Sequence, residues 1–145
     1  MNMKFIKALI GNISDDNKIG IGLLLFRVFI SVLMLTHGFA KLNSFETLSS
    51  QFPDILGIGG KWNLILLIMA EFGCSILIIL GLFTRLSSIP VIFSMIIAAF
   101  IAHANDPFAV KEMAVLYLGL FTFILYMGAG KFSIDYLISK KAKRD

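Results

Sequence analysis

The stretch WNLILLIMAEFGCSILIILGLF, residues 62–83, is long and apolar enough to cross a membrane as one helix. The hydrocarbon layer of a bilayer is about 30 Å thick, and an α-helix needs roughly 20 mostly apolar residues to cross it. Three further apolar runs cover residues 19–41, 86–104 and 112–127. The sequence therefore predicts an all-α protein with four transmembrane helices.

The composition of the whole chain agrees with this prediction. Of its 145 residues, 58% are hydrophobic and 15% are charged, and the mean hydropathy is +0.89. So few charged residues do not supply the polar surface that a soluble globule of this size needs. The net charge of +4 does not indicate nucleic-acid binding, because the basic residues gather near helix ends and in the C-terminal tail without interleaved aromatic residues. We expect the partner there to be anionic lipid headgroups.

The connections between the apolar runs predict the topology. Those between the second, third and fourth runs are short, which forces neighbouring helices to be antiparallel and favours an up-down-up-down bundle. The first connection, residues 42–61, is longer and contains Pro53, Asp54 and three glycines. This composition predicts a structured loop rather than a fifth span.

The two ends of the chain differ from the bundle in composition. In residues 1–18, isoleucine and leucine recur at helical spacing beside Lys4 and Lys7, which is typical of an amphipathic interfacial helix. Basic residues dominate the last segment of the chain. The predicted organisation is an N-terminal cytoplasmic-side segment at 1–18, a four-helix domain at 19–130 and a basic cytoplasmic tail at 131–145.

The distribution of lysine and arginine predicts the orientation, because these residues favour the cytoplasmic side of a membrane. Nine lie on the side of the two termini and three on the opposite side. The nine are Lys4, Lys7, Lys18, Arg85, Lys131, Lys140, Lys141, Lys143 and Arg144, and the three are Lys41, Lys61 and Lys111. We therefore expect both termini to be cytoplasmic, in a bacterial inner membrane.

Two charged residues lie well inside the predicted spans, Arg27 in the first and Glu71 in the second. A charge at the centre of a span costs about 2.5 to 3.5 kcal/mol on the insertion scale, so each needs a partner. At a rise of about 1.5 Å per residue, both are predicted to lie near mid-depth. We expect an Arg27–Glu71 ion pair, which either clamps the two helices together or forms the floor of a functional site.

Further polar residues are predicted to collect at the outer end of the bundle. His37 and Lys41 lie near the end of the first run, His103 ends the third, and Glu112 begins the fourth. Together they predict an outward-facing polar pocket above Glu71. Each also has a structural interpretation: the lysine can extend to the interface, the glutamate can face a helix N-terminus, and each histidine can satisfy a backbone carbonyl.

The residue types in this pocket favour a quinone over a metal or haem. A quinone carbonyl accepts hydrogen bonds from histidine or lysine, and its tail needs an apolar cleft between helices. The two histidines have no HxxH or ExxH spacing, so the sequence predicts no metal site. Cys74 is the one cysteine, which excludes a disulfide relay within the subunit.

Three short motifs in the chain combine glycine with charged residues. They are Arg27 with HGFAKL at 37–42, Glu71 and Gly73 with GLFTR at 81–85, and GAGKFSID at 128–135. In this order they resemble the DoxX family of small four-helix membrane proteins, over about residues 20–135. The resemblance implies the four-helix fold. Some members are associated with quinone-linked oxidation of thiosulfate or with oxidoreductase complexes that handle thiol stress, and distant eukaryotic relatives act as cargo receptors or assembly chaperones.

Two functional hypotheses follow. In the first, the protein is a subunit of a quinone-linked oxidoreductase, with His37, Lys41 and Glu71 as catalytic residues and Arg27, His37, His103 and Glu112 as quinone-binding residues. A redox partner protein would supply the electrons. In the second, the bundle is a non-catalytic scaffold that binds a partner protein or lipid. A transporter is a third alternative, for which we expect a homo-oligomer.

Overall fold

The computed structural model describes residues 16–142, which contain helices and no strand. The helices in chain order are α2 (Asp16–Asn43), α3 (Phe45–Ser49), α4 (Gly60–Ile68), η1 (Met69–Cys74), α5 (Ser75–Leu80), α6 (Thr84–Ile97), η2 (Ala98–Ala102), α7 (Phe108–Met127) and α8 (Ile134–Ala142). The two η segments are π-helical: η1 lies within the second span, and η2 forms the end of the third. The predicted N-terminal interfacial helix falls almost wholly on residues 1–15, outside the described part of the chain.

Four of these helices are long and apolar enough to span a membrane, which confirms the predicted bundle. They are Asn17–Asn43, Gly60–Leu80, Thr84–Ala102 and Phe108–Met127. The fourth begins at Phe108, before the predicted Glu112, because Pro107 is its N-cap: the backbone there is not helical, with φ −55° and ψ 150°, and its carbonyl accepts a hydrogen bond of 3.0 Å from Val110 N–H. The protein is an integral membrane protein.

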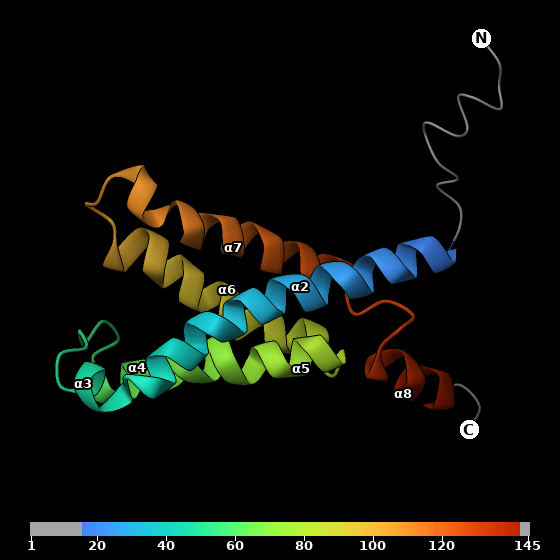
Figure 1. Cartoon of the computed structure of the whole chain (residues 1–145), viewed down its shortest axis with the longest axis horizontal. Coiled ribbons are helices and arrows are strands. Elements are labelled where there is room, and N and C mark those ends of the chain that lie inside the picture. Colours follow the sequence, from blue (N-terminus) through green and yellow to red (C-terminus); the bar gives the residue numbers. More distant parts are fainter. Residues whose placement is uncertain (1–15, 143–145) are drawn as a thin grey trace, which may run out of the picture.

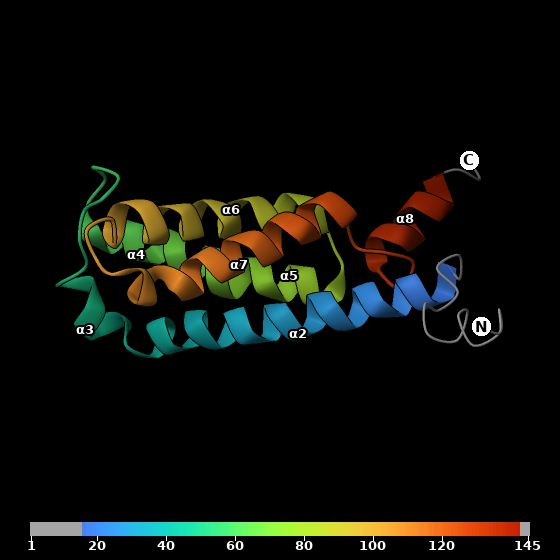
Figure 2. The same ribbon diagram turned by 90° about the horizontal axis from the view of Figure 1, so that it is seen from above.

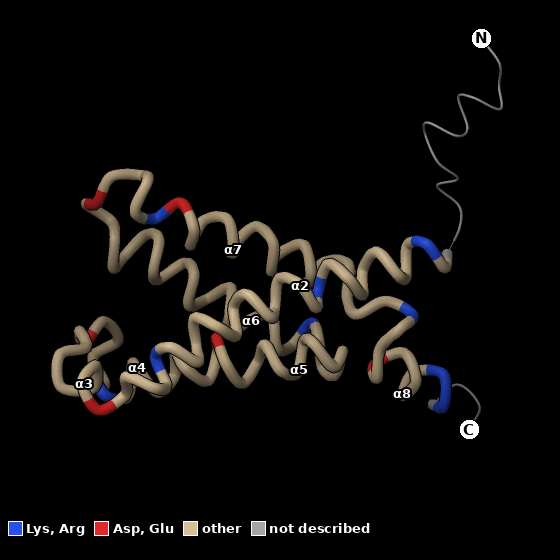
Figure 3. The backbone as a smooth tube through the Cα atoms, in the orientation of Figure 1, with Lys and Arg blue, Asp and Glu red and all other residues tan. Residues whose placement is uncertain are grey.

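The four spans run antiparallel to their sequence neighbours (Figures 1 and 2). α2 packs along the second span through η1 and α5, and α6 packs along α7. We call the end where α2 begins and α8 lies the terminal end, and the end that carries residues 44–59 and 103–107 the loop end. Most charged residues lie towards these two ends (Figure 3).

The bundle buries polar residues among apolar ones and exposes many of its large apolar side chains. Its core consists of Ile30, Met34, Ile78, Val91, Met95, Tyr117, Phe121 and Ile124. Arg27, Ser31, Glu71 and Ser75 are also buried, whereas Leu25 is 64% exposed. This distribution is expected in a bilayer, where polar groups face the bundle interior and apolar groups face lipid.

The predicted basic tail contains a helix that the sequence analysis did not anticipate. α8 occupies Ile134–Ala142 and lies beyond the ends of α5 and α7, level with the first turns of α2 (Figure 1). Asp135 in its first turn and Lys140 and Lys141 in its last turn match the helix dipole. The segment from 128 to 142 is therefore a structured part of the protein.

Candidate functional site

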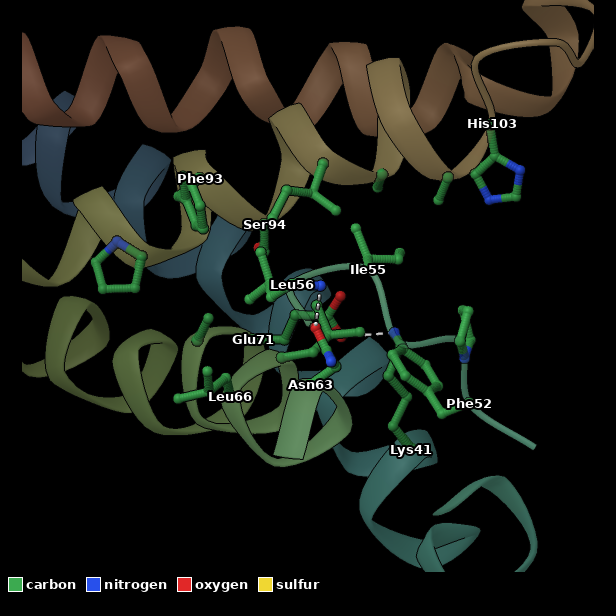
Figure 4. A pocket seen from close by; sticks show the side chains of 17 residues that line it. Lys41, Phe52, Ile55, Leu56, Asn63, Leu66, Glu71, Phe93, Ser94 and His103 are labelled. Atoms are coloured by element: carbon green, nitrogen blue, oxygen red, sulfur yellow. Dashed lines mark hydrogen bonds and ion pairs between the residues drawn. The ribbon is translucent and has the colours of Figure 1, made fainter. Parts of the chain in front are cut away.

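A cavity of about 590 Å³ lies at the loop end of the bundle (Figure 4). Its walls come from the last turns of α2, the loop before α4, the second span through η1, and the third span through η2. Most lining residues are apolar, including Leu56, Leu66, Phe93 and Ile97. The polar exceptions are Lys41, Asn63, Glu71, Ser94 and His103.

An ion pair between Lys41 and Glu71 forms part of the cavity wall. Lys41 Nζ donates a hydrogen bond of 2.6 Å to Glu71 Oε2 (Figure 4). The Glu71 side chain is 5% exposed and that of Lys41 is 27% exposed. A carboxylate buried to this degree needs a charged or hydrogen-bonded partner, and the lysine provides it.

Gly38 allows the two helices to come close enough for this pair. A Cβ atom at residue 38 would lie 2.6 Å from the backbone nitrogen of Phe72, which no side chain tolerates. Gly38 therefore lets α2 touch the π-helical turn that carries Glu71, and Lys41 follows one turn later on the same helix. π-Helical turns within α-helices are frequent at functional sites.

The predicted Arg27–Glu71 ion pair is wrong. Arg27 is buried, but it donates hydrogen bonds to the backbone carbonyls of Ala129 and Phe132, the latter at 2.7 Å. A Cβ on Gly81 would lie 2.8 Å from Arg27 Nη2, so the guanidinium sits level with the end of the second span. Glu71 is about 15 Å nearer the loop end, at 1.5 Å per residue.

The depth estimate assumed that the first two spans end at the same level, but the first has 27 residues and the second 21, so the first turns of α2 extend past the end of the second span. Arg27 is therefore level with Gly81 rather than with Glu71. The prediction also assumed that the partner of Arg27 is a carboxylate. Its partners are instead backbone carbonyls of the segment that follows the last span. Arg27 consequently does not form the floor of the cavity.

The two histidines lie in different environments. His103 lines the cavity, and its Nδ1 lies 2.7 Å from Asp106 Oδ2. His37 is absent from the cavity lining and packs its ring edge-on against Tyr117 of α7, with 5.6 Å between ring centroids. Glu112 also lies outside the lining and is exposed. The structure thus brings Lys41, Glu71 and His103 to one cavity and leaves the other predicted residues outside it.

Sequence reasoning missed Asn63, which fixes the loop over the cavity. Its side-chain oxygen accepts from Leu56 N–H at 3.2 Å, and its Nδ2 donates to Asp54 Oδ1 at 2.8 Å. The signal was an asparagine within an apolar run. Desolvation is the largest single influence on Asp54 and opposes its ionisation, but hydrogen bonds from the Gly59 backbone, from Asn63 and from the neighbouring backbone together outweigh it and lower the pKa of this carboxyl.

The cavity suits an amphipathic ligand. Its apolar walls can hold a ring or hydrocarbon chain, while Lys41 Nζ can donate a hydrogen bond and Glu71 can accept a proton. Among residues 16–142, no group of three or more His, Cys, Asp or Glu side chains is arranged to hold a metal ion.

A second set of charged residues lies at the terminal end, where their side chains hydrogen-bond to the backbone and hold chain segments together. Asp135 Oδ1 and Oδ2 accept from the backbone N–H groups of Phe83 and Thr84, at 2.7 and 2.9 Å, and its own N–H donates to Gly81 O at 2.9 Å. We call Arg27, Gly81 and Asp135 the terminal cluster. It joins α2, the turn before α6, and α8, so the first, second and third sequence motifs meet there.

Comparison with known proteins assigns the sequence to a family. The DoxX family model matches residues 22–104. The chain belongs to the DoxX family. This DoxX match includes the cavity residues Lys41, Glu71 and His103, and it ends before Asp135.

Full-length relatives extend the DoxX match over most of the chain. The inner membrane protein YqjF of Escherichia coli is 28% identical over 125 residues, covering 83% of this chain and 95% of that relative. A protein of Haemophilus influenzae is 32% identical over 126 residues, which cover 79% of this chain and 89% of the length of that relative. No solved structure matches the chain significantly.

Proposed function

We propose that this DoxX protein binds the headgroup of a quinone in the loop-end cavity, as a membrane subunit of a quinone-linked oxidoreductase. The observation that supports this best is the Lys41–Glu71 ion pair in the wall of an otherwise apolar cavity of about 590 Å³. Cavities of roughly 300 to 1,000 Å³ with few polar groups are typical of small-molecule sites. A quinone ring with two carbonyl oxygens has the same mixture of apolar faces and polar edges.

The roles of the residues follow from their positions. Lys41 Nζ donates to one quinone carbonyl, and His103, held by Asp106, lies on the same cavity as a second donor. Glu71 beside Lys41 holds or releases a proton. Leu66, Phe93 and Ile97 cover the ring and the first part of the tail. His37 contacts Tyr117 outside the lining, so it supports the last turns of α2 rather than touching the quinone.

Quinone reduction takes up two electrons and two protons, and this chemistry belongs to the bound quinone. The protein contributes binding, orientation and a protonatable carboxylate. A partner protein with a flavin, haem or iron–sulfur centre would supply the electrons.

The proposed orientation places the cavity on the outer side of the membrane. The excess of basic residues near the terminal end favours that end as cytoplasmic, because lysine and arginine are retained on the inner side. The name of the E. coli relative favours the inner membrane of a bacterium.

A second candidate is lipid or partner binding without redox chemistry. The observation in its favour is that Lys41 and Glu71 already satisfy each other at 2.6 Å, while most of the cavity lining is apolar and suits an acyl chain or an apolar helix. The two proposals differ in whether the ligand must carry hydrogen-bonding carbonyl groups at its polar end.

A quinone titration tests the proposal. We expect a short-tailed ubiquinone or menaquinone analogue to bind the purified wild type, and Glu71→Gln and Lys41→Met each to weaken binding about tenfold or more, as lost charge-assisted hydrogen bonds do. Lys111→Gln, which removes a charge outside the cavity at the same end, is the matched control. Each single variant leaves one buried charge without its partner, which is destabilising. The double variant Lys41→Met/Glu71→Gln removes both charges, so weaker quinone binding in this variant does not reflect unfolding caused by an unpaired charge.

Equal quinone affinity in all variants, or no binding to the wild type, would overturn the quinone proposal. Displacement of the quinone analogue by a saturated fatty alcohol at equal concentration would favour the second candidate, since such a chain lacks carbonyl groups.

A further inference from the structure

A second cavity lies at the terminal end, outside the site described above. Its volume is about 740 Å³, and it is bounded by the first turn of α6, the end of α7 with the following loop, and α8. Its polar lining includes Arg85, Lys131, Tyr136 and Ser139. We propose that this cavity binds the headgroup of an anionic phospholipid.

The depth of the cavity is that of lipid headgroups. The third span begins at Thr84 and the fourth ends at Met127, and residues of both ends line the cavity. Hydrocarbon thickness is matched by the length of the spans, so the points where the spans end mark the boundary between acyl chains and headgroups. Leu86, 66% exposed, lies on the membrane side of this boundary, and Phe83, 59% exposed, lies in the turn at the boundary itself; both offer contacts for acyl chains.

Arg85 supplies the group that would bind the phosphate. Its Nη2 donates to the carbonyl of Tyr126 at 3.1 Å, and a Cβ on Gly128 would lie 3.2 Å from its Nε. These contacts hold the guanidinium at the end of α7. A guanidinium has five N–H donors in a planar array that matches phosphate oxygens. The bond to Tyr126 is the one hydrogen bond of Arg85 among residues 16–142.

The charge balance around the cavity favours an anion. Lys131 lines it, and Lys140 and Lys141 follow Ser139 on α8. The carboxylate of Asp135 is also in the lining, but both its oxygens accept from backbone N–H groups at the start of α6, whose helix dipole offsets its charge. Clusters of basic residues at a membrane surface attract anionic lipids.

The combination of a fixed guanidinium, further lysines, hydroxyl groups and flanking apolar side chains corresponds to a phospholipid rather than to a free anion. A bound headgroup would bridge α6, α7 and α8 and hold α8 at the membrane surface. This inference does not depend on quinone binding, because the two cavities lie at opposite ends of the bundle.

Native mass spectrometry of the full-length protein in detergent tests the proposal. Phosphatidylglycerol and phosphatidylcholine with the same acyl chains are added separately. We expect phosphatidylglycerol to bind at least tenfold more tightly, and Arg85→Gln to remove most of this preference. Lys61→Gln, which removes one charge at the loop end, should leave it unchanged.

Two further arms keep the outcome decisive. Ser139→Asp, which adds a negative charge to the α8 wall away from the core, should weaken phosphatidylglycerol binding even if Arg85→Gln does not fold. Glycerol 3-phosphate, which has the phosphate without acyl chains, should not displace the lipid at tenfold excess. Equal binding of the two lipids, an unchanged preference in both cavity variants, or displacement by glycerol 3-phosphate would overturn the proposal.

Discussion

The terminal cluster and the loop-end cavity both contain charged side chains, but these charges are satisfied in different ways. Arg27 donates to backbone carbonyls, and Asp135 accepts from backbone N–H groups, so each side chain fixes a chain segment. Lys41 and Glu71 instead pair with each other in the wall of a cavity. A buried charge that holds the backbone is structural, whereas a side-chain pair that faces an apolar cavity remains available to a ligand.

The largest expected effect is the loss of Arg27. Arg27→Met leaves the carbonyls of Ala129 and Phe132 without their donor, and hydrogen bonds to charged groups are worth about 1.5 to 3 kcal/mol each, so we expect a loss of about 4 kcal/mol in unfolding free energy. Denaturant unfolding in detergent measures it. If Arg27→Met lost less unfolding free energy than a surface control such as Lys61→Met, the structural role of Arg27 would be contradicted.

Gly38→Ala should affect the cavity through the backbone. The added Cβ would meet the backbone at Phe72, so α2 must move away from η1, with an expected loss of about 2 kcal/mol by analogy with overpacked cores. Quinone-analogue binding should weaken with it because Lys41 moves away from Glu71. Gly22→Ala, where a Cβ meets no neighbour within 4 Å, is the control on the same helix.

Asp135→Ala should have a smaller effect, at the terminal end alone. It removes the acceptor for the N–H groups of Phe83 and Thr84 at the start of α6, and loss of such a cap costs about 1 kcal/mol. Thermal unfolding should report the loss, and quinone-analogue affinity should stay within twofold of the wild type. A large change in affinity would show that the two ends are coupled.

The smallest effect is expected from acidification at Asp54. Its pKa in the folded protein is lowered below that of the unfolded chain, so its stabilising hydrogen bonds are fully present above the unfolded pKa and are lost as the pH falls through the folded value. Hydrogen exchange of residues 54–59, corrected for intrinsic rates, should show loss of protection over that acidic range. Asp54→Asn should remove the pH dependence; its persistence would assign the effect to another group.

The spans and their order were predictable because each depends on a local apolar run, and short connections then fix the topology. The partners of the buried charges were not. Arg27 is satisfied by carbonyls at residues 129 and 132, and no side-chain pattern announces backbone acceptors so far along the chain. The sequence left Lys41 either in the polar pocket or extending to the interface and paired Glu71 with Arg27 instead. Gly38 brings α2 against η1, and Lys41 forms the ion pair with Glu71.

Topology alone correctly placed Lys41 and His103 near one end, but it did not determine which side chains share a cavity. His37 belongs to the same final turns of α2 as Lys41, yet it faces Tyr117 of α7. The rotation of each helix about its axis decides this, and it depends on packing with all its neighbours rather than on one periodic pattern. α8 was missed because its basic composition indicated only a charged tail.

The most direct test of the contrast between the two regions is the dissociation constant of one quinone analogue, measured in the same detergent for Glu71→Gln and for Arg27→Lys. Both variants alter a buried charged residue of the bundle. We predict at least tenfold weaker binding for Glu71→Gln and a change within twofold for Arg27→Lys. Equal weakening in both, or the larger loss in Arg27→Lys, would contradict the distinction between a ligand-binding pair and a structural charge.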